Sequence, residues 1–233
     1  MNYTKPSIVD VTLMDDKGRS LYFHDMSEGS RILELLLYTA YNNEIIPSIA
    51  STGKKDKDLA YIIFHLNSKK LNIIGCLMDL TTEIPNCEFN IRSDSTSKIY
   101  VELSCDSENA DQMFTRIKEE IEDNMINTNH THNYQIMSTV YNIAKIINDV
   151  INAQILFVTG AKLYTQGKCG VAIYKEKQNT KISFKKAVPI NSVIEEIKTK
   201  AALNLPAVFF CTFEELRNFY FELDETVYGK EGE

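Results

Sequence analysis

The stretch that most constrains the fold of this chain is residues 59–80, LAYIIFHLNSKKLNIIGCLMDL. It holds two apolar runs, each of about eight to ten residues, separated by Asn-Ser-Lys-Lys. Apolar side chains occupy neighbouring positions in both runs. Because successive strand residues point to opposite faces of a sheet, such runs need cover on both sides. The abundance of Ile, Tyr and Phe favours strands over a buried helix, so the stretch predicts the central hairpin of a covered sheet.

The remaining apolar patterns predict further strands and helices in alternating groups. The predicted strands are an opening hairpin over 7–24 with a turn at 15–18, then 88–92, 98–105, 153–159, 169–175, 181–188 and 207–211. The predicted helices are 31–42, 106–126, 134–151, 192–203 and 212–228, the last two opening on the capping boxes Ser192/Glu195 and Thr212/Glu215. Strands mostly follow strands, which predicts an α+β fold with a mixed or mainly antiparallel sheet covered by amphipathic helices.

The chain divides at an Asn-rich segment. Residues 127–133 have no periodicity, and on either side a group of strands runs into an amphipathic helix. This pattern predicts an N-terminal α+β lobe over 1–126, a joint over 127–133 and a C-terminal α+β lobe over 134–233. Whether the two lobes share one sheet stays open at this point.

Net charge, the lengths of the apolar segments and the cysteine count argue against several classes of protein. The 25 basic and 32 acidic residues give a net charge of -7, which argues against general binding to duplex nucleic acid. No segment approaches the roughly 20 apolar residues that span a bilayer, and the first residues lack the apolar core of a secretory signal. The five cysteines are odd in number and form no CxxC motif. They predict reduced thiols in a cytoplasmic protein.

The segment 158–170, VTGAKLYTQGKCG, is the candidate ligand site. A Walker A loop needs four residues between its glycines and a Ser or Thr after the lysine. Here six residues separate Gly160 from Gly167, and Cys169 takes the hydroxyl position, so a Walker loop is excluded. The segment still predicts anion binding through Lys162 and Lys168. An ordinary connecting turn is the alternative.

Three other groups of residues have the chemistry of catalytic or metal sites but not the full pattern. Two histidines in one loop lack further metal ligands nearby, a set of carboxylates lacks the spacing of a nuclease centre, and two cysteines lack an adjacent histidine in sequence. We therefore expect loop histidines, surface acids and core thiols, with no metal and no cofactor. These residues are His130 and His132; Asp79, Glu83 and Glu88; Cys169 and Cys211.

The last predicted helix carries more aromatic surface than one core-facing stripe requires. Aromatic residues are enriched at the centres of protein interfaces, which predicts contact with another chain, while burial within its own domain is the alternative. The predicted interface residues are Phe213, Phe219, Tyr220, Phe221 and Tyr228.

These patterns favour a non-catalytic, soluble protein-interaction module that binds another protein or itself through the C-terminal helix. The acidic face of 119–123 is a second candidate surface. The main alternative is an enzyme or sensor that binds a nucleotide or other phosphorylated ligand at 160–170, with a carboxylate such as Asp79 assisting. A third hypothesis is an acidic decoy that occupies a nucleic-acid-binding site on another protein.

Overall fold

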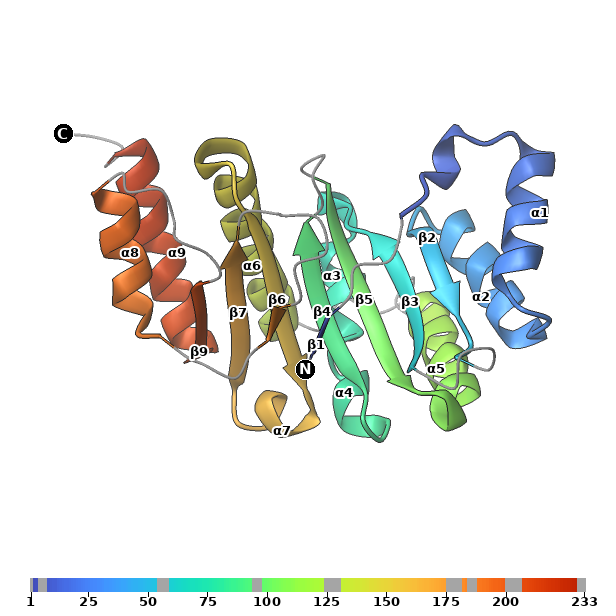
Figure 1. Ribbon diagram of the computed structural model, residues 1–233. Coiled ribbons are helices and arrows are strands. Elements are labelled where there is room, and N and C mark those ends of the chain that lie inside the picture. The colour runs from blue at the N-terminus through green and yellow to red at the C-terminus, as the bar shows by residue number, and fades with distance from the viewer. Residues whose placement is uncertain are drawn as a thin grey trace.

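The computed structural model describes residues 2–3, 8–53, 59–93, 98–123, 131–174, 182–183, 188–199 and 207–229 (Figure 1). The strands are β1 (Asn2–Tyr3), β2 (Ile46–Ser51), β3 (Leu59–His65), β4 (Glu88–Ser93), β5 (Ile99–Asp106), β6 (Gln154–Gly160), β7 (Lys168–Tyr174), β8 (Ile182–Ser183) and β9 (Ala207–Thr212). The α-helices are α1 (Asp16–Met26), α2 (Arg31–Asn42), α3 (Leu71–Cys76), α4 (Leu80–Glu83), α5 (Ala110–Asp123), α6 (Thr131–Ile146), α7 (Ala161–Tyr164), α8 (Ile190–Lys198) and α9 (Phe213–Tyr228). Short 3-10 turns η1 (Val11–Leu13), η2 (Ser68–Lys70) and η3 (Ser107–Asn109) and a π-helical turn η4 (Ile147–Ile151) complete them.

Seven strands form one antiparallel sheet in the order β2-β3-β5-β4-β6-β7-β9, and β1 pairs with β8 apart from it. The predicted α+β class with a mainly antiparallel sheet is therefore confirmed. Strands from both halves of the chain meet at β4 and β6, where Ile91 lies opposite Phe157. The two halves share one sheet, while their division into separate lobes stays a prediction.

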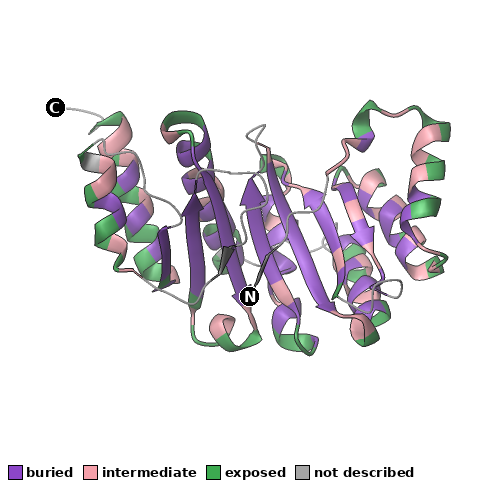
Figure 2. Ribbon diagram, in the orientation of Figure 1, coloured by how far each residue is buried: buried purple, intermediate pink, exposed green. Residues whose placement is uncertain are grey.

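The sheet has one face covered by helices. Helices α3, α5, α6 and α9 lie behind the sheet in Figure 1, and β1 lies in front of it. On β4, Phe89 and Ile91 point to the helices and join the main core, while Asn90 and Arg92 point to the other face. Each fully buried Phe or Ile stabilises the fold by about 1.5–3 kcal/mol. Figure 2 shows that the strands are buried along most of their length.

The hairpin predicted over 59–80 is wrong in its second half. Residues 59–65 form β3, but the second apolar run is helical and forms α3 and α4. Helix α3 lies against α6, and a Cβ on Gly75 would come within 3.0 Å of the backbone carbonyl carbon of Asn133. A short helix enclosed on all sides has the same continuous apolar run as a strand covered on both faces, which explains the error.

The opening hairpin predicted over 7–24 is also wrong, because the described residues 8–24 contain η1 and most of α1, while residue 7 lies outside the described residues. Residues 15–18, which were predicted to form a turn, instead contain the N-cap and the first residues of α1. The side chain of Asp15 accepts a hydrogen bond of 2.7 Å from the backbone N–H of Gly18, which caps α1. Phe23 and Met26 then face the core from this helix.

Most of the other predicted elements are confirmed within a few residues, namely α2, β4, β5, α5, α6, β6, β7, β9 and α9. The capping box of Thr212 and Glu215 is present at the start of α9. The box predicted at Ser192 is wrong, because α8 begins two residues earlier, directly after Pro189. Of the helix predicted over 192–203, residues 192–198 belong to α8, and 200–203 lie outside the described residues. Of the strand predicted over 181–188, 182–183 form β8 and 188 lies outside a strand, while 181 and 184–187 lie outside the described residues.

The predicted joint over 127–133 is only partly described. Residues 127–130 lie outside the described part of the chain, and 131–133 form the first turn of α6 rather than a loop. Within the described residues, each helix is too short or too polar to cross a membrane.

Candidate functional site

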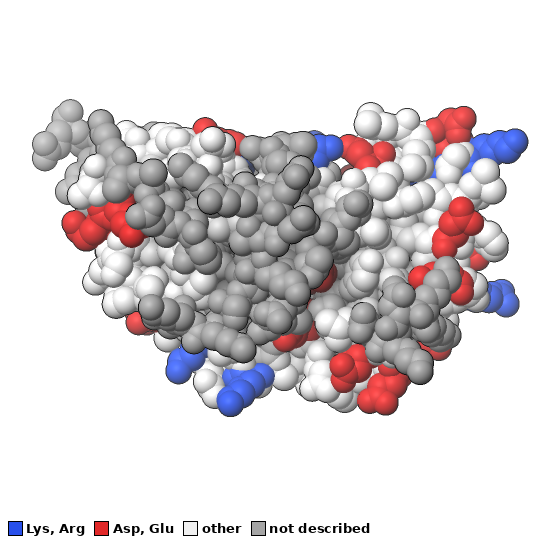
Figure 3. Space-filling view, in the orientation of Figure 1, with Lys and Arg blue, Asp and Glu red and all other residues white. Residues whose placement is uncertain are grey.

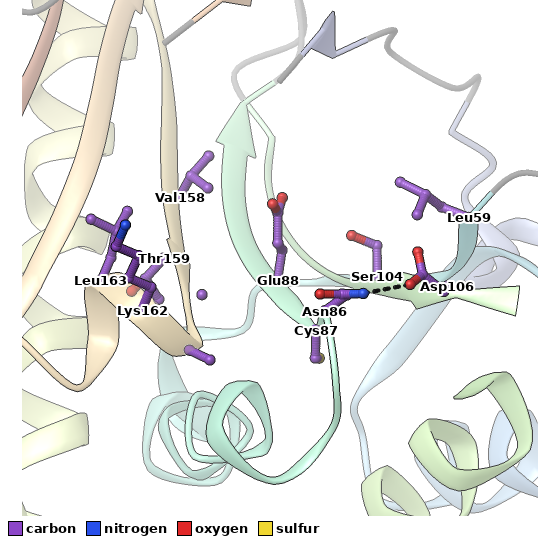
Figure 4. Close-up of a pocket in the computed structure, with 12 residues that line it drawn as sticks. Leu59, Asn86, Cys87, Glu88, Ser104, Asp106, Val158, Thr159, Lys162 and Leu163 are labelled. Carbon is purple, nitrogen blue, oxygen red and sulfur yellow. Dashed lines mark hydrogen bonds between the residues drawn. The ribbon is translucent and has the colours of Figure 1, made fainter. Parts of the chain in front are cut away.

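A pocket of about 480 Å³ lies at one end of the sheet, on the face opposite the helices (Figure 4). Its lining comes from the ends of β3, β4, β5 and β6 and from α7. The polar lining residues are Asn86, Glu88, Ser104, Asp106, Thr159 and Lys162, and the other lining residues are Leu59, Cys87, Val158, Gly160, Ala161 and Leu163.

Strand register brings these residues together. Glu88 of β4 lies opposite Ser104 of β5 on one side and opposite Gly160 of β6 on the other. Asp106 lies two residues beyond Ser104 and therefore points to the same face of the sheet. Helix α7 follows Gly160 directly and carries Lys162 to the rim of the pocket. The pocket therefore depends on pairing between strands that lie far apart in the sequence.

Glu88 is the most unusual group in the pocket. Among the described residues, no group donates a hydrogen bond to its buried Oε2 atom. Burial raises the pKa of Glu88 above its ordinary value; the positive charge of the amino terminus opposes the rise, and repulsion from Glu102 adds a smaller contribution to it. Asp106 differs, because its Oδ2 accepts a hydrogen bond of 2.6 Å from Nδ2 of Asn86. Among the described residues, the Asp106 carboxylate therefore has a hydrogen-bond donor in the pocket, while Oε2 of Glu88 has none.

Of the four predicted ligand-binding residues in 160–170, two line the pocket and two lie outside it. Gly160 and Lys162 line the pocket. Gly167, with a φ of 64°, forms the left-handed turn into β7, and Lys168 is exposed at the start of that strand. Figure 3 shows basic atoms at the lower edge of the molecule, in the region of α7, and acidic atoms further along the same edge.

The three grouped carboxylates have three different surroundings. Asp79 accepts a hydrogen bond of 2.6 Å from the Tyr164 hydroxyl and one of 3.0 Å from Nδ2 of Asn133. These bonds connect α7 to the start of α6, and burial together with Asp79 raises the pKa of Tyr164 above its ordinary value. Glu83 instead forms an ion pair of 2.9 Å with Arg116 on α5. Only Glu88 lines the pocket.

The histidine and cysteine candidates lie outside this pocket. His132 is exposed on α6 with its ring 6.2 Å from that of Phe213, and His130 lies outside the described residues. In the described part of the chain, no group of three potential metal-binding side chains comes together. All five cysteines are buried and unbridged. The Sγ atoms of Cys169 and Cys211 lie 3.5 Å apart, and their contact and burial raise the pKa of Cys169.

Sequence reasoning missed a band of buried polar residues on the same sheet face as the pocket. Asn90 is almost fully buried, and no described residue forms a hydrogen bond with its amide. Nε of Arg92 lies 3.7 Å from Oε2 of Glu102 on β5, and both side chains are largely buried. The polar alternation in β4, EFNIRS, gave the only signal, and it is equally typical of a solvated face.

A groove of about 240 Å³ runs between α6 and α9 on the helical side. Its lining from α6 is polar apart from Tyr134, and its lining from α9 is Arg217, Tyr220 and Phe221. The Arg217 guanidinium lies 5.5 Å from the centre of the Phe221 ring. The groove is therefore amphipathic, with aromatic rings on both sides and amide and hydroxyl groups along α6.

The predicted interface residues have different degrees of exposure. Phe221 and Tyr228 are 52% and 62% exposed. Phe219 is buried against Phe209, with their ring centres 5.7 Å apart. Phe213 and Tyr220 are partly buried against the core. Tyr134, which the sequence did not single out, is exposed and lines the same groove as Phe221.

No protein-family model matches this chain, and comparisons with curated proteins and with solved structures also find no match.

Proposed function

We propose that this chain is a non-catalytic protein-interaction module that binds its partner through the face formed by α6 and α9. The observation that carries the proposal is the set of exposed aromatic rings at the α6–α9 groove. Tyr134 is 45% exposed and Phe221 is 52% exposed, and both line the groove. Tyr228 extends this exposed aromatic surface along α9.

Helix α9 carries apolar residues that pack into the core and others that remain exposed to solvent. Leu216, Phe219 and Leu223 are buried and attach the helix to the sheet. Phe221 and Tyr228 make no comparable contribution to the core, since half or more of each side chain is exposed. Large aromatic residues and arginine dominate the energetics of many interfaces, which supports a binding role for Phe221, Tyr134 and Arg217.

The groove fits a helix or an extended segment with an apolar anchor. The aromatic rings offer contact area for that anchor, and the Ser138 and Thr139 side chains of α6 offer hydrogen bonds along its path. The Asn142 side chain hydrogen-bonds Tyr220 in the same groove. The partner is another protein or a second copy of this chain. Five buried, unbridged cysteines are consistent with a reducing compartment, and we propose the cytoplasm as its location.

Site-specific photo-crosslinking tests the proposal. A benzophenone amino acid replaces Phe221 in one variant and Leu21 in a control variant. Leu21 is 58% exposed on α1, so the two positions have similar exposure on different elements. We expect a discrete crosslinked species from position 221, identified by mass spectrometry as a partner protein or as a dimer, and none from position 21.

The crosslinking result is checked with unmodified protein by light scattering after size exclusion. The proposal predicts a complex of defined mass that contains the crosslinked partner. A strictly monomeric protein with equal, diffuse crosslinking at positions 221 and 21 contradicts it.

The alternative function is binding of a nucleotide or other phosphorylated ligand at 160–170. In its favour, Gly160 and Lys162 line the pocket at the end of the sheet. Thermal unfolding with a panel of nucleotides tests this alternative. A ligand at a hundredfold its dissociation constant adds about 2.7 kcal/mol to the free energy of unfolding. An unchanged melting temperature with every nucleotide excludes it.

A further inference from the structure

We infer that the pocket at the end of β3, β4, β5 and β6 binds an organic cation, with the ammonium group of the ligand on Glu88 and its apolar part against Leu59, Val158 and Leu163. This site is separate from the α6–α9 groove, so the inference goes beyond the proposed interaction function. It rests on the charges, the unmet acceptor and the walls of the pocket.

The charged groups of the pocket favour a cation over an anion. Among the described residues that line the pocket, Glu88 and Asp106 supply two carboxylates and Lys162 supplies one ammonium group. Figure 4 shows the Glu88 side chain rising from β4, between Val158 on β6 and Ser104 and Asp106 on β5. A phosphate in this position would face two like charges. An ammonium group would face two opposite ones.

The Oε2 atom of Glu88 provides a specific contact for the ligand. Within the described residues, nothing hydrogen-bonds to this buried atom. A buried acceptor without a partner is costly, whereas a hydrogen bond from a charged donor is stronger than one between neutral groups. An ammonium group carries three donors. It can satisfy Oε2 and still donate to neighbouring oxygens such as the Ser104 hydroxyl.

The size and walls of the pocket favour an organic ligand over a hydrated metal ion. A volume of about 480 Å³ falls in the range of small-molecule sites. Leu59, Val158 and Leu163 contribute apolar walls. A divalent metal ion usually takes several oxygen or nitrogen ligands, and the described part of the chain brings no three such acidic, His or Cys side chains together. The inferred ligand is therefore a primary amine with an apolar body.

A matched set of three probes tests this inference on the unmodified protein. Phenethylammonium, 2-phenylethanol and phenyl phosphate share a phenyl ring and differ in charge. Ligand-detected NMR titrations at pH 7 and low salt measure the three dissociation constants. We expect phenethylammonium to bind at least about tenfold more tightly than 2-phenylethanol, which corresponds to about 1.4 kcal/mol. Phenyl phosphate should bind no more tightly than the alcohol.

Two glutamate variants locate the effect. Glu88→Gln keeps the shape of the side chain and should abolish the preference for the ammonium probe. Glu108→Gln removes an exposed charge on η3, outside the pocket, and should leave the preference within about twofold. Asp106→Asn, with an intermediate loss, is a second reporter if Glu88→Gln does not fold.

Several results would overturn the inference. They are the absence of measurable binding by phenethylammonium, equal binding of the ammonium and the alcohol, and an ammonium preference that persists in a folded Glu88→Gln variant. Tighter binding of phenyl phosphate would also overturn it and would favour the anion site predicted from the lysines.

Discussion

Two phenylalanines that lie two residues apart on α9 should respond very differently to removal. Phe219 is 1% exposed and packs edge-to-face on Phe209 in the core. Phe221 projects outward from the same helix. The prediction is that Phe219→Ala strongly destabilises the fold and that Phe221→Ala does not.

The expected magnitudes follow from burial. Removing a buried Phe side chain costs its transfer free energy and leaves a cavity, which together amount to about 3–5 kcal/mol. For a chain of this size, that lowers the melting temperature by about 6–20 °C. Phe221 keeps roughly half of its surface in water, with the Arg217 guanidinium 5.5 Å and the Tyr220 ring centre 5.4 Å from the centre of its ring. Its removal should cost about 1 kcal/mol, part of which the higher helix propensity of Ala offsets.

Urea unfolding followed by circular dichroism at 222 nm measures both variants. The midpoint of unfolding should fall clearly for Phe219→Ala and stay near the wild-type value for Phe221→Ala, with unchanged slopes. Equal losses for the two variants, or a loss below about 1 kcal/mol for Phe219→Ala, would refute the assignment of core and surface on α9.

Three further predictions concern other parts of the molecule. Gly75→Ala should destabilise by about 1–3 kcal/mol, because its Cβ would press on the backbone of Asn133; a neutral effect in urea unfolding would argue against the close packing of α3 on α6. Glu88→Gln should stabilise the protein at pH 7, because the raised pKa makes ionised Glu88 unfavourable in the fold, and this gain should disappear as the pH falls below the ordinary pKa of 4.5. A pH-independent difference between wild type and variant would contradict that assignment. A thiol reagent should modify none of the five cysteines rapidly in the native protein and all five in urea; rapid reaction of any native thiol would show that it is exposed.

The sequence predicted elements where the periodic pattern was long and one-sided. Helix α5 is an example, because its buried residues Met113, Phe114, Ile117 and Ile121 recur at three- and four-residue spacings. The prediction was wrong where the apolar run was short and continuous, as in the second half of 59–80. The run that forms α3 is apolar apart from Asn72 because its neighbours enclose most of the helix, and periodicity alone does not separate that case from a covered strand.

The candidate sites were predictable only in part, because they depend on long-range pairing. The glycines and lysines of 160–170 predicted a ligand site at Gly160 and Lys162. Glu88 and Asp106 join these residues only through the pairing of β4 with β5 and β6. On α9, composition identified an excess of aromatic residues without showing which of them point outward. Tyr134 contributes to the groove because α6 packs against α9, and its own sequence neighbourhood carries no such signal.

The most direct test of the proposed interaction surface is the affinity of the purified protein for the partner identified by crosslinking. Isothermal titration calorimetry compares wild type with Phe221→Ala and with the control Leu21→Ala. We predict that Phe221→Ala weakens binding by about 30-fold, as expected for loss of about 2 kcal/mol at an interface centre. Leu21→Ala should bind like wild type. Unchanged affinity in a folded Phe221→Ala variant would contradict the claim that the α6–α9 face binds the partner.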